Sequence, residues 1–205
     1  MTGPDAAEVL DLLDWRRRIA ELYARVRVEN DPARGWTLWR ETRDRMFRTH
    51  PQSPLATQAR ASFAGLAYFD YDPRWRATAT LRPGDALHLE IPTSGEDPMA
   101  IERVGVLTLE VAGAAVELEA YWLTSYGGGL FVPFRDATAG NTTYGAGRYL
   151  LDTVKGADLG AENGAVVLDF NFAYNPSCSY DPAWVCPLAP PANRLDIAIE
   201  AGERL

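Results

Sequence analysis

The chain has 205 residues, 47% of them hydrophobic, and a formal net charge of −8. This composition suits a folded protein with a sizeable core. No run of about 18 apolar residues occurs, so we expect no membrane-spanning helix and no membrane partner.

The acidic excess lies in the later part of the chain. Residues 1–60 carry 11 arginines against 9 acidic residues, whereas residues 61–205 carry 9 basic and 19 acidic residues. Phosphate contacts need clustered Lys and Arg, so we expect no nucleic-acid partner. The start, MTGPDAAEVLDLLDW, is acidic and lacks the basic-then-apolar pattern of a signal peptide. We therefore expect a cytoplasmic protein.

Two helices are predicted at the N-terminal end. Asp5 and Glu8 have the spacing of a capping box, and apolar residues then recur at helical spacing to about Val28. Asp31-Pro32 predicts the start of a second helix, which His50-Pro51 ends. Its aromatic face is expected to pack on a sheet, or alternatively to form a dimer surface; this face holds Trp36, Trp39, Met46 and Phe47.

His50 lies in the proline-fenced stretch HPQSP, which we interpret as a linker. A helix C-terminal position suits this histidine better than the role of a catalytic base. We therefore predict a helical segment over residues 1–53 and an antiparallel β domain over residues 54–205.

The period changes after Ala61 to the alternation typical of strands. No helical pattern separates the strands, so parallel crossovers are not expected. The predicted fold is α+β and mainly β, with N-terminal helices packed on an antiparallel β-sandwich or flattened barrel. The predicted strands are Phe63–Phe69, Trp75–Leu81, Leu87–Ile91, Leu107–Val111, Val116–Trp122, Leu130–Phe134, Arg148–Leu151, Val166–Phe172 and Leu195–Ile199.

The turns and the polar faces follow from the same pattern. Gly113 is predicted to join two strands that bury one face and expose an acidic one. Arg82–Asp85 and Asn163-Gly164 are predicted turns. His88 falls on the polar face of its strand and is expected in solvent.

The two cysteines, Cys178 and Cys186, are separated by seven residues in a loop with five prolines. Two reduced thiols that pack the loop are expected, with a disulfide or a zinc site as alternatives. Zinc would need two further ligands, and only His50 and His88 are available. We predict no metal and no cofactor, and no GxSxG serine motif occurs.

A polar constellation stands out on the predicted strands. In LDFNF the apolar side chains are expected on one face, and Asp169 and Asn171 on the other. Arg148 is an isolated charge in an apolar run, and a buried charge must pair or meet a ligand. Either Arg148 and Asp169 pair and tie the strands together, or they form the floor of a pocket. The other candidate site residues are Arg135, Asp136, Tyr144, Tyr174, Asn175 and Asn193.

Three functions fit these observations. The first is a protein that binds a small polar or anionic metabolite through Arg148, Arg135 and the Asp169–Asn171 face. The second is an enzyme that uses Asp169 as general acid or base, with Arg148 and Tyr144 holding the substrate. The third is a structural or interaction protein whose N-terminal helices form a homodimer.

Two segments carry a family resemblance. FRDATAGNTTYGAGRYL (134–150) and LDFNFAYNPSCSYDPAWVCPLAPPANRLDIAIEAGE (168–203) resemble the signature of a bacterial family known only as a domain of unknown function. The shared pattern contains TYxxGRYL, LDFNxAYNPxC, a CPL-to-NRL segment and a terminal AGE, and Ala189 stands where the pattern has proline. The resemblance implies a β-rich fold and no assigned activity. It marks Arg135, Asp136, Thr138, Tyr144, Arg148, Tyr149, Asp169, Asn171, Asn175, Cys178, Cys186, Pro187 and Asn193.

Overall fold

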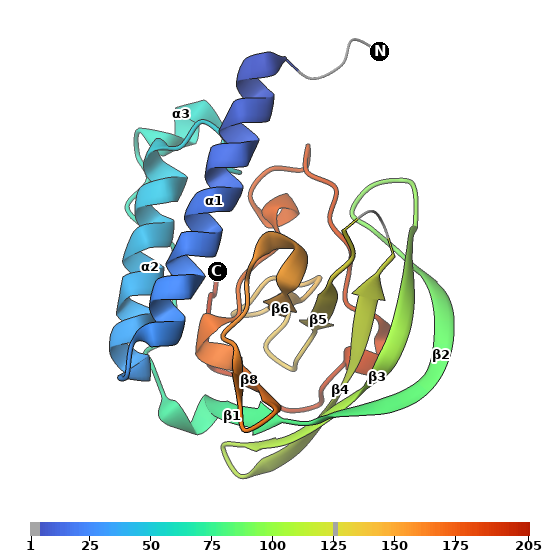
Figure 1. The fold of residues 1–205 in the computed structure, drawn as a ribbon. Coiled ribbons are helices and arrows are strands. Elements are labelled where there is room, and N and C mark those ends of the chain that lie inside the picture. Colours follow the sequence, from blue (N-terminus) through green and yellow to red (C-terminus); the bar gives the residue numbers. More distant parts are fainter. Residues whose placement is uncertain (1–4, 125–126) are drawn as a thin grey trace.

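The computed structural model describes residues 5–124 and 127–205. Two helices, α1 (Ala6–Val28) and α2 (Pro32–Thr49), lie side by side along one flank of a β-rich body (Figure 1). The short helix α3 (Thr57–Arg60) follows the second of them. No helix in the described part of the chain is long and apolar enough to cross a bilayer.

The helix starts are as the sequence predicts. The capping box of Asp5 and Glu8 is formed, with the Asp5 amide donating to Glu8 Oε2 at 3.3 Å. The Asp31 carboxylate accepts from the Ala33 amide at 2.9 Å, and Pro32 occupies the first turn. These contacts satisfy amide groups that a helix start leaves without a partner. His50 is the C-cap residue of α2, which confirms its predicted helix-terminal position.

The strands form two antiparallel sheets, as predicted. The larger has the order β2-β3-β4-β5-β6, and the smaller has the order β1-β8-β7. The strands of the larger sheet are β2 (Leu81–Ile91), β3 (Met99–Val111), β4 (Ala114–Leu123), β5 (Leu130–Phe134) and β6 (Arg148–Asp152). Those of the smaller sheet are β1 (Arg76–Ala79), β7 (Ala161–Glu162) and β8 (Ala165–Asp169). The α+β, mainly β prediction is confirmed.

The hairpin of β3 and β4 is the longest paired segment, with register partners from Ile101 and Leu123 to Val111 and Ala114. Leu107 and Leu118 are partners and fully buried, whereas the alternate position Glu117 is exposed. Gly113 makes the tight turn at φ +80°, which glycine adopts without steric cost. The hairpin therefore has the predicted buried apolar face and solvent-exposed acidic face.

Two hydrophobic clusters hold the layers together. One lies between the sheets and includes Leu118, Phe134, Leu168 and Phe170. The other joins the helices to the β body through Leu22, Trp36, Trp39, Phe131, Tyr149 and Phe172. The aromatic face of α2 therefore packs inward, as predicted. The predicted boundary between residues 53 and 54 stays a prediction.

Several predicted strands and turns are wrong. Residues 63–69 and 195–199 form no strand. The first segment carries one isolated bridge, from Tyr68 to Glu203, and the second contains a bend at Asp196 and Ile197. Arg82–Asp85 is not a turn between strands but lies inside β2, where the register with β3 shifts between Pro83 and Leu87. Residues 170–172 form a 3-10 turn, so β8 ends at Asp169.

Further short 3-10 turns complete the chain at Pro73–Trp75, Thr153–Lys155, Ser177–Ser179 and Pro191–Asn193. The predicted Asn163-Gly164 turn is present between β7 and β8, with both residues at positive φ. His88 has a side chain that is 84% exposed, as expected.

Candidate functional site

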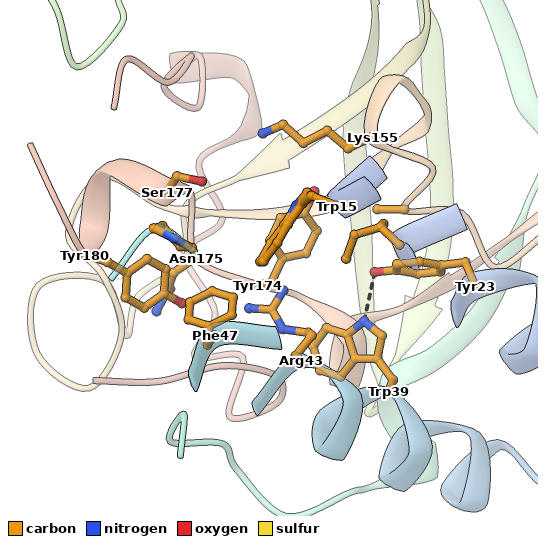
Figure 2. Close-up of a pocket in the computed structure, with 13 residues that line it drawn as sticks. Trp15, Tyr23, Trp39, Arg43, Phe47, Lys155, Tyr174, Asn175, Ser177 and Tyr180 are labelled. Carbon is orange, nitrogen blue, oxygen red and sulfur yellow. Dashed lines mark hydrogen bonds between the residues drawn. The ribbon is translucent and has the colours of Figure 1, made fainter. Parts of the chain in front are cut away.

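A cavity of about 60 Å³ lies between the two helices and the segment that follows Tyr174 (Figure 2). Each helix contributes three side chains at every fourth position, which places them on one helix face. These are Trp15, Ile19 and Tyr23 from α1, and Trp39, Arg43 and Phe47 from α2. The opposite wall is formed by Pro54, Lys155, Ala157, Tyr174, Asn175, Ser177 and Tyr180.

The cavity continues into a groove of about 300 Å³, and the two share Trp15, Ile19, Pro54, Lys155 and Ser177. The cavity alone holds a few water molecules, whereas the groove is at the lower end of the size of small-molecule pockets. Besides the shared residues, the groove is lined by Leu12, Arg16, Gln52, Trp184, Val185 and Cys186.

Arg43 is the buried charge of this cavity. Its Nη2 donates to Glu203 Oε2 at 2.6 Å, and its Nε donates to Tyr68 Oη at 3.1 Å. Its guanidinium carbon lies 4.8 Å from the centre of the Trp39 ring and 5.1 Å from that of Tyr174. Burial opposes the charge, but Tyr68 and Glu203 outweigh it and raise the pKa of Arg43.

Glu203 lies behind Arg43 and is 1% exposed. It accepts hydrogen bonds from the Tyr180 hydroxyl and, at 3.1 Å, from the backbone N–H of Asn175. Burial raises the pKa of Glu203 to about 7, although Arg43 acts to lower it. The cost of burying the carboxylate therefore exceeds what its partners return, which is common for buried ion pairs.

Polar groups with free hydrogen-bonding capacity remain at the cavity. In the described part of the chain, Arg43 Nη1 donates no hydrogen bond, and the buried Asn175 Oδ1 accepts none. Lys155, the single lysine of the sequence, has its Nζ 3.7 Å from Asp152 Oδ2, with a side chain that is 47% exposed. Figure 2 shows Arg43 amid the aromatic rings and Lys155 at the far side of the cavity.

In the described part of the chain, the charged side chains that line the cavity and the groove are all cationic. Arg43 and Lys155 line the cavity, and Arg16 and Lys155 line the groove. No aspartate or glutamate of residues 5–124 and 127–205 lines either one. In a chain with a net charge of −8, this lining favours an anion.

Arg148 lies elsewhere, and it does not pair with Asp169. Its fully buried guanidinium donates to the backbone carbonyls of Ile199, Ala201 and Glu203 and to Asp136 Oδ1 at 3.3 Å. Asp136 Oδ2 accepts from the Ile199 amide at 2.8 Å. Burial lowers the pKa of Arg148, while Asp136 acts to raise it. The pair fixes the C-terminal segment against β6.

Asp169 and Asn171 form a second local network. Asp169 Oδ1 accepts from Asn171 N at 2.9 Å and from its Nδ2 at 2.8 Å, because the chain turns directly after β8. Arg76 Nη1 lies 3.6 Å from Asp169 Oδ2. Burial raises the pKa of Asp169 to about 6, with Asn171 opposing it. The predicted strand face shared by Asp169 and Asn171 is therefore wrong.

The other predicted site residues are dispersed. Tyr144 lies beside Cys178, with 3.8 Å from its hydroxyl to Sγ, and burial raises the pKa of Tyr144 to about 12. Arg135 pairs through its backbone with Asn193 and Leu195. The Asn193 side chain is buried between β4 and β5, where it bonds the backbone of Glu119 and Pro133. Tyr174 and Asn175 line the cavity, whereas Asp169, Arg148 and Tyr144 contact three separate sets of partners.

The residues that sequence reasoning missed are Arg43, Lys155, Tyr180 and Glu203. For two of these residues, a feature of the sequence could have pointed to the site. Glu203 is the acid of the terminal AGE in the family pattern. Arg43 continues the helical spacing of Trp36 and Trp39, so it was a charge on the face predicted to be buried.

Both cysteines are free. Cys186 is buried, and its sulfur accepts from the Cys178 amide at 3.4 Å. Burial raises the pKa of the Cys186 thiol. In the ranges 5–124 and 127–205, no group of three His, Cys, Asp or Glu side chains is arranged to hold a metal ion.

Comparisons with known proteins bear on the family of the chain. A family model described as a protein of unknown function (DUF1684) matches residues 61–204. The solution NMR structure of an uncharacterized protein of Haloarcula marismortui is 37% identical, with a TM-score of 0.58. That match covers 81% of this chain and 90% of the other. No curated protein matches the chain.

Proposed function

This chain belongs to the family described as a protein of unknown function (DUF1684), and from its cavity we propose that it binds a small polar or anionic metabolite. The observation that carries the proposal is the lining of the cavity and groove, which among the described residues has aromatic walls, three cationic side chains and no carboxylate. Small-molecule sites are typically apolar concavities with a few polar groups that fix the ligand.

Arg43 defines the inner end of the proposed site. Glu203 and the rings of Trp39 and Tyr174 hold its guanidinium in place. An immobilised guanidinium with a free Nη1 binds a carboxylate or phosphate oxygen without further ordering of its side chain. The side-chain amide of Asn175 also lies at this end and is placed to hydrogen-bond the remaining polar atoms of the ligand.

Lys155 and Arg16 define the outer end. Both are partly exposed and line the groove next to Trp15, so they attract an anion from solvent before it reaches Arg43. The aromatic side chains between the two ends suit an apolar or planar ligand body. The ligand class is therefore a small anion with an apolar or aromatic part. We place the protein in the cytoplasm, where two free thiols are the usual state.

A thermal-shift experiment tests the proposal with matched pairs of probes. Benzoate and benzamide have nearly the same shape, but only benzoate carries a charge. At about ten times its dissociation constant, a bound ligand adds roughly 1.4 kcal/mol of stability, or about 3–5 °C for a chain of this size. We expect benzoate to raise the melting temperature and benzamide to have little effect.

Three variants locate the site. Lys155→Gln is expected to weaken benzoate binding, whereas Lys155→Arg keeps the charge and most of the affinity. Arg82→Gln is the control, because Arg82 is 63% exposed on β2 and pairs there with Glu117. Equal shifts with benzoate and benzamide, or equal losses in Lys155→Gln and Arg82→Gln, would contradict the proposed anion site.

A further inference from the structure

Helix α1 has a second apolar stripe, on the side opposite the cavity. Its inner face is buried through Leu22, Tyr23 and Val26. Its outer face repeats mainly apolar residues at steps of four, three, four, three, four and four, which is close to the spacing of a coiled-coil seam. The stripe consists of Ala6, Leu10, Leu13, Ala20, Ala24 and Val28, all of them exposed.

The exposure of this stripe is large for a surface helix. Leu10 is 63% exposed, Leu13 is 50% exposed and Val28 is 78% exposed. The one polar member of the repeat is Arg17, near the middle of the helix. Figure 1 shows α1 along the outside of the molecule, with its first turns extending past the β body. An exposed, mainly apolar stripe of this kind marks an interaction surface.

The charges beside the stripe specify the occupant. Asp14, Arg18, Glu21 and Arg25 run along one flank of the stripe with alternating sign at steps of four, three and four. In a two-fold symmetric pair the same surface of both copies meets itself, and the two helices run antiparallel. The reversed row is Arg25, Glu21, Arg18 and Asp14, so each charge faces an opposite one. Within one copy, Asp14 Oδ2 also lies 2.7 Å from Arg18 Nε and 3.0 Å from His50 Nε2.

The apolar residues of the stripe favour nearly the same alignment. If Arg18 of one copy faces Glu21 of the other, then Asp14 faces Arg25. In registers one and two residues away from that alignment, Leu10 faces Val28 and Leu13 faces Ala24. Arg17 then faces Ala20, a small residue that leaves room for its stem to lie along the seam. The charge row and the apolar stripe thus both favour an antiparallel pairing, in registers that differ by no more than two residues.

We propose that α1 pairs with α1 of a second copy in this antiparallel register to form a homodimer. The helix has 23 residues and is about 34 Å long, so a seam about 10 Å wide buries on the order of 350 Å² per copy. This area is below that of stable complexes, and we expect a dissociation constant in the micromolar range or weaker. The proposal does not depend on the ligand site.

Sedimentation of the full-length protein from about 5 to 500 µM tests the proposal. We expect the mass to rise from 22.6 kDa toward twice that value. Leu13→Glu places two like charges near the seam and is expected to weaken the dimer about 100-fold. Leu87→Glu is the matched control, because Leu87 is a 44% exposed leucine on β2.

Charge exchange tests the register. Arg18→Glu and Glu21→Arg each bring like charges together and are expected to weaken the dimer, whereas the double variant restores opposite pairs and association. The proposal is overturned if the wild-type protein stays monomeric at 500 µM. It is equally overturned if Leu13→Glu associates as tightly as Leu87→Glu, or if the double variant is no better than the single ones.

Discussion

The buried Glu203 predicts an unusual dependence of stability on pH. Its pKa is about 7 in the folded protein, against 4.5 for a free side chain. Because the folded pKa is raised, the stability linked to this group is present below pH 4.5 and is lost as the pH rises through 7. One pKa unit corresponds to 1.36 kcal/mol, so the loss between pH 5 and pH 8 is roughly 3 kcal/mol.

Asp169 adds to the loss over part of the same range. Its pKa is raised from 3.8 to about 6, so the stability that Asp169 contributes to the fold is lost between about pH 4 and pH 6. Above pH 5 this amounts to only about 1 kcal/mol. The wild-type protein should therefore be less stable at pH 8 than at pH 5 by roughly 4 kcal/mol.

Glu203→Gln isolates the larger contribution. The amide oxygen can accept from Arg43 and from the Asn175 nitrogen, and the amide group can donate to the Tyr180 oxygen. The variant should match the wild type at pH 5 within about 1 kcal/mol and exceed it at pH 8, because no carboxylate needs to ionise inside the protein.

Urea unfolding at pH 5 and pH 8 measures both proteins. Asp169→Asn is the matched control, since it should remove only the smaller part of the difference in stability between pH 5 and pH 8. If the wild-type protein is equally stable at the two pH values, ionisation of Glu203 does not lower its stability. The same conclusion follows if Glu203→Gln loses as much stability between pH 5 and pH 8 as the wild type does.

Three further substitutions and one control test the packing around the C-terminal segment by urea unfolding. Asp136→Ala removes the counter-charge of the buried Arg148 and should cost about 3–5 kcal/mol, whereas Asp196→Ala, at an exposed carboxylate, should cost less than about 0.5 kcal/mol. Gly202→Ala should cost at least about 2 kcal/mol, because φ is +78° and the new Cβ would lie 2.6 Å from the carbonyl oxygens of Phe170 and Ala173. Asn193→Ala leaves the Glu119 amide and two carbonyls without their partner and should cost about 2–3 kcal/mol, so a loss under 0.5 kcal/mol would contradict its assigned role.

Local patterns in the sequence predicted the fold well. The β3–β4 hairpin followed from strict alternation around Gly113, and the helix starts followed from Asp5 and Asp31. Residues 195–199 alternate in the same way but form no strand. Their backbone instead pairs with the segment after β5, an arrangement set by tertiary contacts rather than by the local period.

The partners of the buried charges could not be predicted in the same way. Arg148 and Asp169 were correctly identified as charges in apolar runs, and both are fully buried. Asp169 meets Arg76 because β1 pairs with β8 in a register that aligns these two residues. Arg43 and Glu203 are 160 residues apart, and only the packing of α2 on the C-terminal segment brings them together.

The location of a bound anion tests the proposed function most directly. A crystal grown with 4-bromobenzoate would place the ligand by the anomalous signal of its bromine. We predict a carboxylate on Arg43 Nη1 and a ring between Trp15 and Tyr174, with the bromine in the groove near Lys155. Density for the ligand only at other surfaces, with the cavity filled by water at saturating ligand, would contradict the account.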